Sequence, residues 1–252
     1  MHQREAFLVG LKPGQFKING LDSEEFNVYL RSRPQRLSAG RVIELKPRPG
    51  NDSVVVDFAY YKNVEWKIQC NAKADSLESV SNLEDRIRSW LDMSNYSDFT
   101  YIFDAHYIYQ AVVVSPPVFT GTHKDADWVP FEFTISLRPF KQSRTGLRWL
   151  SNEKKIHNIE KYPSKPKIQV LGSGDISFWI NDKKYELTNI GNEIIIDSLL
   201  EESYRIVDGV LESQDNKTKF IDFPILPEGL TTIRWQGNVT EFRLMPRWWT
   251  KV

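Results

Sequence analysis

The residues that could bind a metal or act as acid–base catalysts are few and lie far apart in the sequence. None of the four histidines lies two to five residues from a cysteine or from another histidine, which is the spacing of metal-binding arrays. We interpret His2, His106, His123 and His157 as surface or hydrogen-bonded residues. The sequence therefore predicts no metal site.

The one candidate nucleophile is Cys70, the only cysteine of the chain. It falls on the apolar phase of the run Trp66–Cys70, and no neighbouring histidine could act as its base. We expect a buried apolar side chain rather than a reactive thiol. A single cysteine also rules out an intramolecular disulfide, which fits folding in a reducing compartment.

Two further motifs resemble parts of enzyme sites. Leu171–Asp175 contains two glycines, but no lysine follows and the next residues have strand character, so we predict a hairpin turn instead of a phosphate loop. The pair Glu201–Glu202 could supply carboxylates for glycoside hydrolysis, although a solvated charged turn explains it more simply. We predict no catalytic residues, no cofactor and no enzymatic activity.

The end of the chain carries the most informative signal. Val239–Met245 alternates with the period of a strand, and Pro246 then removes a donor from the ladder. Trp248 and Trp249 follow side by side, and successive side chains of an extended backbone point to opposite faces. Because each ring can bury about 150–250 Å², we predict that Arg247, Trp248 and Trp249 form an interface with another domain or another chain.

Composition and charge limit the number of domains and the kinds of function that this protein can have. The 252 residues suffice for one or two domains, and 40% hydrophobic with 26% charged residues is ordinary for a globular protein. Lys and Arg number 33, as do Asp and Glu, so the net charge is zero. This balance argues against a protein whose main task is to grip nucleic acid. Met1–Glu5 begins no apolar signal sequence, and we expect no membrane insertion.

The elements that must position these residues are mainly β-strands. The clearest is Phe131–Leu137, in which alternate residues are apolar. One helix interrupts the strands, because apolar residues recur at spacings of three and four over 77–91. Asp75 followed by Glu78 predicts a capping box at its start, and Trp90 should lie in the core. Further short strands are predicted at Val54–Phe58, Trp66–Cys70, Thr100–Phe103 and Gln110–Val114.

A change in composition separates two domains. After Arg138–Phe140 the chain is polar and basic without a sustained period, which is typical of a linker. Strands then resume without any helix pattern, which predicts an antiparallel sandwich. Its turns are predicted at Asn181–Asp182, Gly191–Asn192 and Gln236–Asn238. We predict an N-terminal domain over 1–142, a linker over 143–166 and a C-terminal domain over 167–252.

A set of short motifs lies in a specific order along nearly the whole chain. The first half contains Phe16–Gly20, Trp90–Leu91, Ala105–Ala111 and Pro139–Phe140. The second half contains Pro166–Ile168, Gly172–Ile176, Ile194–Ser198 and Pro246–Thr250. This ordered set resembles the distal tail proteins of siphophages, and within that family those of lactococcal phages. The order of the motifs, together with the terminal tryptophan pair, makes the resemblance specific.

The resemblance implies a mainly β fold, with a ring-forming N-terminal domain that has one helix and a galectin-like C-terminal β-sandwich. Such proteins form hexameric rings at the tail tip of the virion and are made and assembled in the host cytoplasm. The implied partners are other copies of the chain, the tail tube protein, the tail-associated protein below the ring, and baseplate or receptor-binding proteins. DNA passes through the ring without specific binding, so the implied role lies in host attachment and DNA ejection.

The resemblance to a sugar-binding galectin is incomplete. Galectins carry a His-x-Asn-Pro-Arg strand, which is absent here, and a Trp-Gly-x-Glu turn, for which Trp235–Asn238 lacks the glutamate. The C-terminal domain is also too compact to hold an inserted carbohydrate-binding module. The alternative function is binding of host-surface glycans, motivated by the sandwich and by aromatic residues such as Trp149. A cell-wall hydrolase is a third and weaker class, because nothing in the sequence resembles its catalytic acids.

Overall fold

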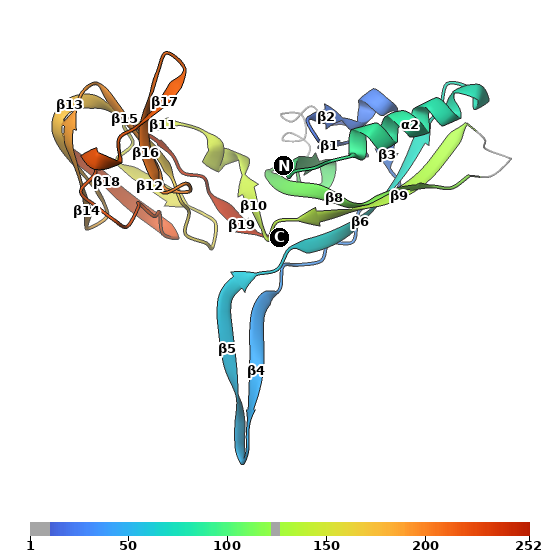
Figure 1. Ribbon diagram of the computed structural model, residues 1–252, viewed down its shortest axis with the longest axis horizontal. Coiled ribbons are helices and arrows are strands. Elements are labelled where there is room, and N and C mark those ends of the chain that lie inside the picture. Colours follow the sequence, from blue (N-terminus) through green and yellow to red (C-terminus); the bar gives the residue numbers. More distant parts are fainter. Residues whose placement is uncertain (1–10, 122–126) are drawn as a thin grey trace. The chain divides into compact units, whose positions relative to one another are not determined.

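The computed structural model describes residues 11–121 and 127–252. Contacts divide the chain into two compact units, Met1–Lys141 with Lys251–Val252, and Gln142–Thr250. Figure 1 shows that strands dominate both units and that the α-helix α2 belongs to the first. The prediction of a mainly β protein with two domains is therefore confirmed, and the described residues contain the one predicted α-helix.

An antiparallel sheet forms the frame of the first unit. Its strands are hydrogen-bonded in the order β2-β1-β7-β8-β9-β6-β3. Their bounds are β1 Phe16–Ile18, β2 Leu21–Asp22, β3 Val28–Leu30, β6 Val64–Lys73, β7 Ser97–Tyr101, β8 Tyr107–Phe119 and β9 Trp128–Leu137. Two more strands, β10 (Phe140–Ser143) and β19 (Trp249–Lys251), pair with each other where the chain passes between the units, and β10 also pairs with β8.

The register of β6 and β9 confirms the predicted alternation. The two strands pair over ten residues, from Val64 opposite Leu137 to Lys73 opposite Trp128. Phe131, Phe133 and Ile135 are buried on one face, as the sequence predicts. Cys70 is fully buried, and its burial raises the pKa of the thiol, so it is the apolar side chain that we expected.

The helix covers an aromatic core. A 3₁₀ turn, Leu77–Ser79, leads into α2 (Val80–Leu91), and Trp90 is buried as predicted. The Trp90 ring stacks on Phe26 with centroids 4.4 Å apart, while its Nε1 donates to the carbonyl of Ile18 at 3.0 Å. The predicted start at Asp75 is wrong by one residue, because Ser76 and Ser79 form the capping box.

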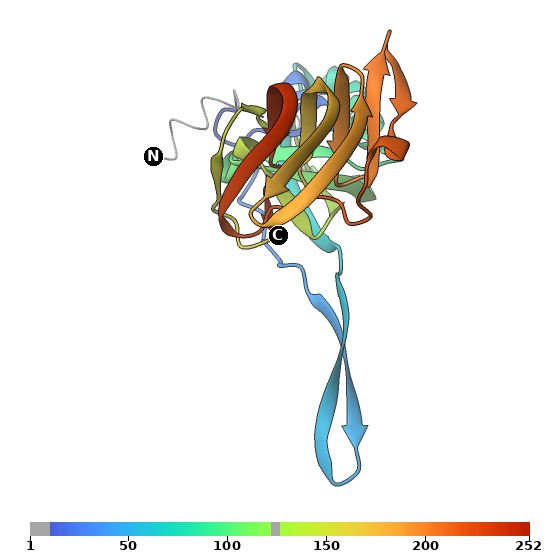
Figure 2. The same cartoon turned by 90° about the vertical axis from the view of Figure 1, so that its left-hand side faces the viewer.

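Two long strands of the first unit do not join its sheet. The strands β4 (Arg41–Arg48) and β5 (Asn51–Tyr61) pair with each other and with no other strand of the described residues. Figures 1 and 2 show this hairpin extending away from the rest of its unit. The predicted strand Val54–Phe58 is therefore confirmed as a strand, within a hairpin that pairs with no third strand in 11–121 or 127–252.

The second unit is a curled antiparallel sheet (Figure 2). Its strands are paired in the order β11-β18-β13-β15-β16-β17. Two further strands join it, since β12 pairs with β18 and β14 pairs with β13. The bounds are β11 Leu150–Ser151, β12 Lys155–Asn158, β13 Lys167–Ile180, β14 Lys183–Ile190, β15 Glu193–Asp197, β16 Glu202–Val207, β17 Val210–Ser213 and β18 Gly229–Met245. The core contains Ile168, Phe178, Tyr185 and Phe242. The galectin-like arrangement stays a prediction.

Two predicted turns of the second unit are wrong, because they lie inside long strands. The segments 171–175 and 236–238 belong to β13 and β18, which pair along both lengths with shifts of register. An added Cβ at Gly172 would lie 2.3 Å from the carbonyl oxygen of Asn238, and one at Gly237 2.6 Å from that of Asp175. The glycines therefore permit close approach of two backbones at β-bulges rather than reversal of the chain.

The stretch 143–166, predicted as a linker, carries structure of its own. It contains a 3₁₀ turn, Arg144–Leu147, and the short strands β11 and β12, and contacts assign it to the second unit. These strands have two and four residues, too few to produce a sustained hydrophobic period. Their pairing with β18 holds them in place, which local composition does not reveal.

Candidate assembly surfaces

The C-terminal segment is held by residues from the stretch that precedes β13. Pro246 follows β18, and its carbonyl accepts a hydrogen bond of 2.7 Å from the hydroxyl of Ser164. Arg247 then adopts a left-handed backbone with φ of 54°, and its N–H donates to the carbonyl of Gly146 at 2.7 Å. The chain therefore turns sharply after the strand and is fixed at both residues of the turn.

A buried ion pair anchors the same turn. The guanidinium of Arg247 binds both carboxylate oxygens of Asp197, with Nη2 to Oδ2 at 2.8 Å, and Asp197 is only 1% exposed. Lys167 lies 3.6 Å from the same carboxylate. Burial alone would raise the pKa of Asp197, but the hydrogen bonds and charge of Arg247 outweigh it and hold that pKa below its ordinary value.

The tryptophan pair continues this anchored segment. The N–H of Ser143 donates to the carbonyl of Trp248 at 2.8 Å, and Trp249 Nε1 donates to the carbonyl of Pro163 at 2.7 Å. Both rings are half-buried. A Cβ on Gly146 would lie 2.4 Å from the backbone nitrogen of Trp248, so the close contact requires glycine. The structure thus brings Arg247, Trp248 and Trp249 together within the second unit, and their role as an interface stays a prediction.

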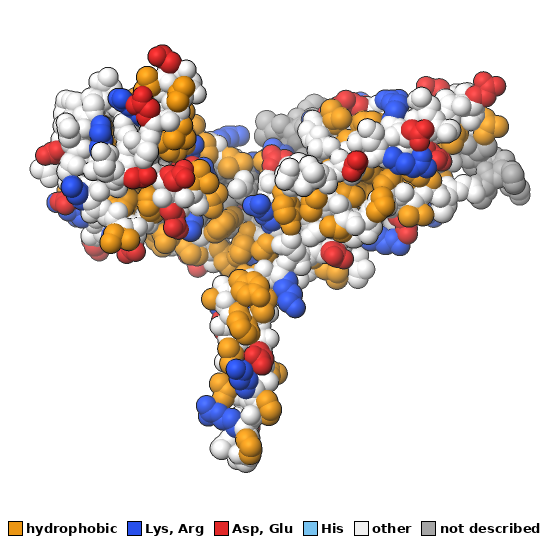
Figure 3. All heavy atoms as spheres, in the orientation of Figure 1, with side chains coloured by type: hydrophobic (Ala, Val, Ile, Leu, Met, Phe, Trp, Pro, Cys, Tyr) orange, Lys and Arg blue, Asp and Glu red, His pale blue; other side chains and the backbone are white. Residues whose placement is uncertain are grey.

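The β4–β5 hairpin is an apolar surface that sequence reasoning missed. Several of its large apolar side chains are about half exposed or more, with Leu45 at 62% and Val55 at 58%. Figure 3 shows apolar atoms along the length of the hairpin. The sequence marks it only by two strand-like runs around Pro47, Pro49 and Gly50, and such runs do not tell an exposed hairpin from a buried one.

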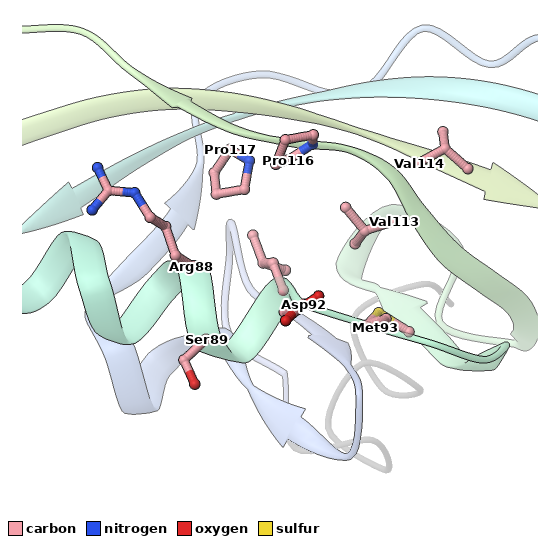
Figure 4. A pocket seen from close by; sticks show the side chains of 9 residues that line it. Arg88, Ser89, Asp92, Met93, Val113, Val114, Pro116 and Pro117 are labelled. Carbon is pink, nitrogen blue, oxygen red and sulfur yellow. The ribbon is translucent and has the colours of Figure 1, made fainter.

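A groove lies in the first unit between the end of α2 and β8. Its volume is about 790 Å³, and Figure 4 shows side chains from both elements lining it. The helix side supplies Arg88, Ser89, Leu91, Asp92 and Met93, and the strand side supplies Val113, Val114, Pro116 and Pro117. No local pattern in the sequence indicates this groove, because its two walls come from elements that are separate in the chain.

A partly buried cluster of charges, also unforeseen, lies elsewhere in the first unit. The carboxylate of Asp104 accepts hydrogen bonds from Lys141, from Arg36 at 2.8 Å and from the hydroxyl of Tyr109. Burial raises the pKa of Tyr109, and the Asp104 carboxylate raises it further, so the phenol is held neutral. Such a neutral donor and two cations around one anion make a structural network and not a reactive site.

The other candidate metal-binding or catalytic residues do not form a common site in the described part of the chain. His106 and His157 are exposed, and His2 and His123 lie outside the described residues, as does Met1–Glu5. Among residues 11–121 and 127–252, no group of three or more His, Cys, Asp or Glu side chains could hold a metal ion. Glu201 pairs with Lys165 at 3.0 Å and is well exposed, as a solvated charged turn requires.

The aromatic residues of the glycan hypothesis are spread over the second unit. Trp235 stacks on Phe242 with centroids 4.8 Å apart, so this ring belongs to the core. Trp179 lies under the guanidinium of Arg234, 4.9 Å from its centroid, and Trp149 is 43% exposed. The comparable galectin spot, Trp235–Asn238, is part of a bulged strand and not a turn.

Comparison with known proteins finds a similar fold but no similar sequence. The chain matches no protein-family profile and no curated protein sequence. The crystal structure of the SPP1 Dit protein, described as a paradigm of the hub adsorption apparatus in phages that infect Gram-positive bacteria, matches with a TM-score of 0.70. The match covers 91% of this chain and 96% of that one, at 11% identity. The chain has the fold of SPP1 Dit.

A second solved structure agrees with this fold. A chain of the phage P2 baseplate in its activated conformation with calcium matches with a TM-score of 0.50 at 11% identity. The match covers 94% of this chain and 98% of that one. Both likenesses extend over both units, so the order of the units along the chain is shared with Dit and baseplate proteins. In the described part of the chain, no helix has the length and apolar character needed to cross a membrane.

Proposed function

We propose that this protein is the distal tail hub of a phage, a ring that joins the tail tube to the baseplate and the host-binding apparatus. The likeness to SPP1 Dit over 91% of the chain is the observation that carries the proposal. Likeness of fold alone supports many functions, but here the matched proteins belong to hubs and baseplates in both cases. The ordered motifs of the sequence support the same family, including a kinship with lactococcal siphophages.

The exposed hairpin supports assembly into a ring. A closed ring repeats one heterologous interface, so every copy must present two complementary surfaces. A two-stranded hairpin is marginally stable alone in water, and this one exposes Leu45, Val55 and Phe58. Contact with a neighbouring copy would cover these side chains. We therefore assign ring formation, with six copies, to the first unit.

The remaining surfaces suit the partners of a hub. The second unit offers attachment area for the tail-associated protein and for baseplate or receptor-binding proteins, and Arg247, Trp248 and Trp249 would take part in an interface between domains or subunits. A net charge of zero suits a channel, because strong attraction to phosphates would slow the passage of DNA. In this proposal the protein resides in the virion, at the tail tip, after assembly in the host cytoplasm, and it has no catalytic role.

The proposal is tested by the mass and shape of the purified protein. We expect mass photometry at micromolar concentration to show six copies, and negative-stain images to show rings with a central hole. The same measurement follows with the tail tube and baseplate proteins of the same phage added. Monomers under every one of these conditions would contradict the hub function.

Binding of host-surface glycans is the second candidate. Trp179 is flanked by Arg234 and by Lys184, which lies 5.7 Å from its ring centroid, and a partly exposed ring of this kind can stack on a sugar. Titration calorimetry with cell-wall saccharides of the host tests this candidate. Binding that is lost in Trp179→Ala and kept in Trp149→Ala would support it, and the absence of heat at millimolar saccharide would exclude it.

A further inference from the structure

Four neighbouring strands of the second unit place a tryptophan and three cations on the solvent face of their sheet. In the register, Trp179 of β13 stands opposite both Arg234 of β18 and Lys184 of β14. Lys155 of β12 stands opposite Thr232, which lies two residues before Arg234 and so on the same face. The residues that alternate with these on β13 and β18 are buried in the core: Phe178, Ile180 and Ile233. Trp179 and the three cations therefore share the face that meets solvent.

The indole of Trp179 lies between two of these cations. The guanidinium carbon of Arg234 is 4.9 Å from the ring centroid, and Lys184 Nζ is 5.7 Å from it. The two cations come from the strands on either side of β13. The indole is partly exposed, and both cations are exposed. A ligand that lies across the three strands therefore meets a cation, an aromatic ring and a second cation in that order.

The positive charges of this face exceed the negative ones. Lys184 forms an ion pair with Glu186 of its own strand. Arg234 and Lys155 are exposed and form no ion pair with any residue in 11–121 or 127–252. The whole chain has a net charge of zero, so the excess is local. An anionic ligand would gain the attraction of two unpaired cations and would break no existing ion pair to do so.

The side chains around Trp179 suit a saccharide better than a protein partner. One row along the strands, Ser177 stands opposite Gln236 and Glu186. Their hydroxyl, amide and carboxylate groups can form hydrogen bonds with the hydroxyl groups of a sugar. A protein interface has an apolar centre, whereas this face offers one aromatic ring surrounded by polar and cationic groups. Such a ring can contact the C–H groups of a sugar.

We infer that this face of β12, β18, β13 and β14 binds an anionic saccharide. One sugar unit lies at Trp179, and the anionic groups on either side of that sugar meet Arg234 and Lys184. A chain of sugars linked through phosphodiesters has this order of charge, ring and charge, and so has a chain of uronic acids. Such binding gives the second candidate function its class of ligand, so it rests on that candidate and does not depend on the ring.

Titration calorimetry on the full chain tests the class of ligand. The probes are an oligo(glucosyl phosphate), an oligogalacturonate and the neutral maltoheptaose. We expect an anionic probe to bind more tightly than maltoheptaose, and its binding to weaken as salt is added, because salt screens exposed charges. The two anionic probes distinguish a phosphodiester from a carboxylate as the source of the charge, and tighter binding of either supports the assignment.

Single substitutions locate the site. Arg234→Gln and Lys184→Gln should each weaken binding of the anionic probe about two- to fivefold, and Trp179→Ala should abolish it. The two glutamine variants keep the indole, so they test the site even if Trp179→Ala does not fold. Arg148→Gln is the matched control, because Arg148 is an exposed arginine of the same unit that precedes β11, at the other end of β18. It should bind as the wild type does.

Several results would overturn the assignment and leave the hub function intact. Maltoheptaose that binds as tightly as the anionic probes would leave a neutral glycan site in its place. Equal weakening by Arg148→Gln, or equal binding of a thymidine oligonucleotide of similar charge, would show a general attraction to polyanions. No heat with any saccharide at millimolar concentration would exclude the glycan candidate together with this assignment.

Discussion

The guanidinium of Arg247 and the carboxylate of Asp197 meet across 50 residues of sequence and share two hydrogen bonds. This pair fixes the terminal segment to the end of β15, because Asp197 is the last residue of that strand. Asp197 also accepts hydrogen bonds from the N–H groups of Leu199 and Leu200. One buried side chain thus holds both a turn and the end of the chain.

Removal of the arginine should destabilise the second unit. Arg247→Ala leaves the buried carboxylate of Asp197 with Lys167 as its remaining cation, and loss of one partner of a buried pair costs about 3–5 kcal/mol. We expect a decrease near the lower end of that range in the free energy of unfolding, measured by urea denaturation. Arg205→Ala, which breaks the exposed pair with Glu212, should change it far less.

The same pair should make stability depend on acid. The pKa of folded Asp197 is below its ordinary value, so the stabilisation is fully present well above about pH 3.9 and is lost as the pH falls through the folded pKa. As the pH is lowered from 6 to 3, we expect the free energy of unfolding to fall more for the wild type than for Asp197→Asn. Parallel curves for the two proteins between pH 6 and pH 3 would contradict this assignment.

Any side chain at Gly146 should disturb the terminal segment. Gly146→Ala places a methyl group 2.4 Å from the nitrogen of Trp248, so the backbone must move, and we expect a loss of about 1–3 kcal/mol in thermal denaturation. Gly191→Ala is the matched control, because the nearest atom to its added Cβ is Arg205 Nη1 at 3.9 Å. Equal melting temperatures for the two variants would show that the segment adapts freely.

Truncation of both tryptophans tests their role as an interface. Loss of a fully buried tryptophan costs about 3–5 kcal/mol, and because both rings are half-buried we expect roughly 2–4 kcal/mol for Trp248→Ala with Trp249→Ala. If the rings also join the two units, limited proteolysis should cut between the units faster than in the wild type. Unchanged melting together with unchanged assembly would mean that the rings have no structural role.

Polar substitutions on the hairpin should separate folding from assembly. Leu45→Ser with Val55→Ser should change the free energy of unfolding of the monomer by no more than about 0.5 kcal/mol, the range of surface substitutions. The reason is that both side chains are mostly exposed. Mass photometry should show loss of the ring. Ile221→Ser, at a fully exposed site of the second unit, should keep the ring. Rings in the double variant would exclude the hairpin from the interface.

The sequence by itself determined the elements whose signals are local. Helical spacing over 77–91 placed α2 and buried Trp90, and the alternation in Phe131–Leu137 placed β9, because each pattern follows from the geometry of one element. The apolar phase of Cys70 correctly predicted a buried thiol. The terminal tryptophan pair, with the ordered motifs, identified a family whose fold the structure shares.

The tertiary structure decided everything that depends on a distant strand. Gly172 and Gly237 carry the same local signal as a turn, and only their opposing backbones make them bulges. Arg247 finds Asp197 because β18 and β15 both pair with β13, which no local pattern encodes. Exposure of the β4–β5 hairpin was decided in the same way, since burial of an apolar strand requires a neighbour, and this hairpin has none within its own chain's described residues.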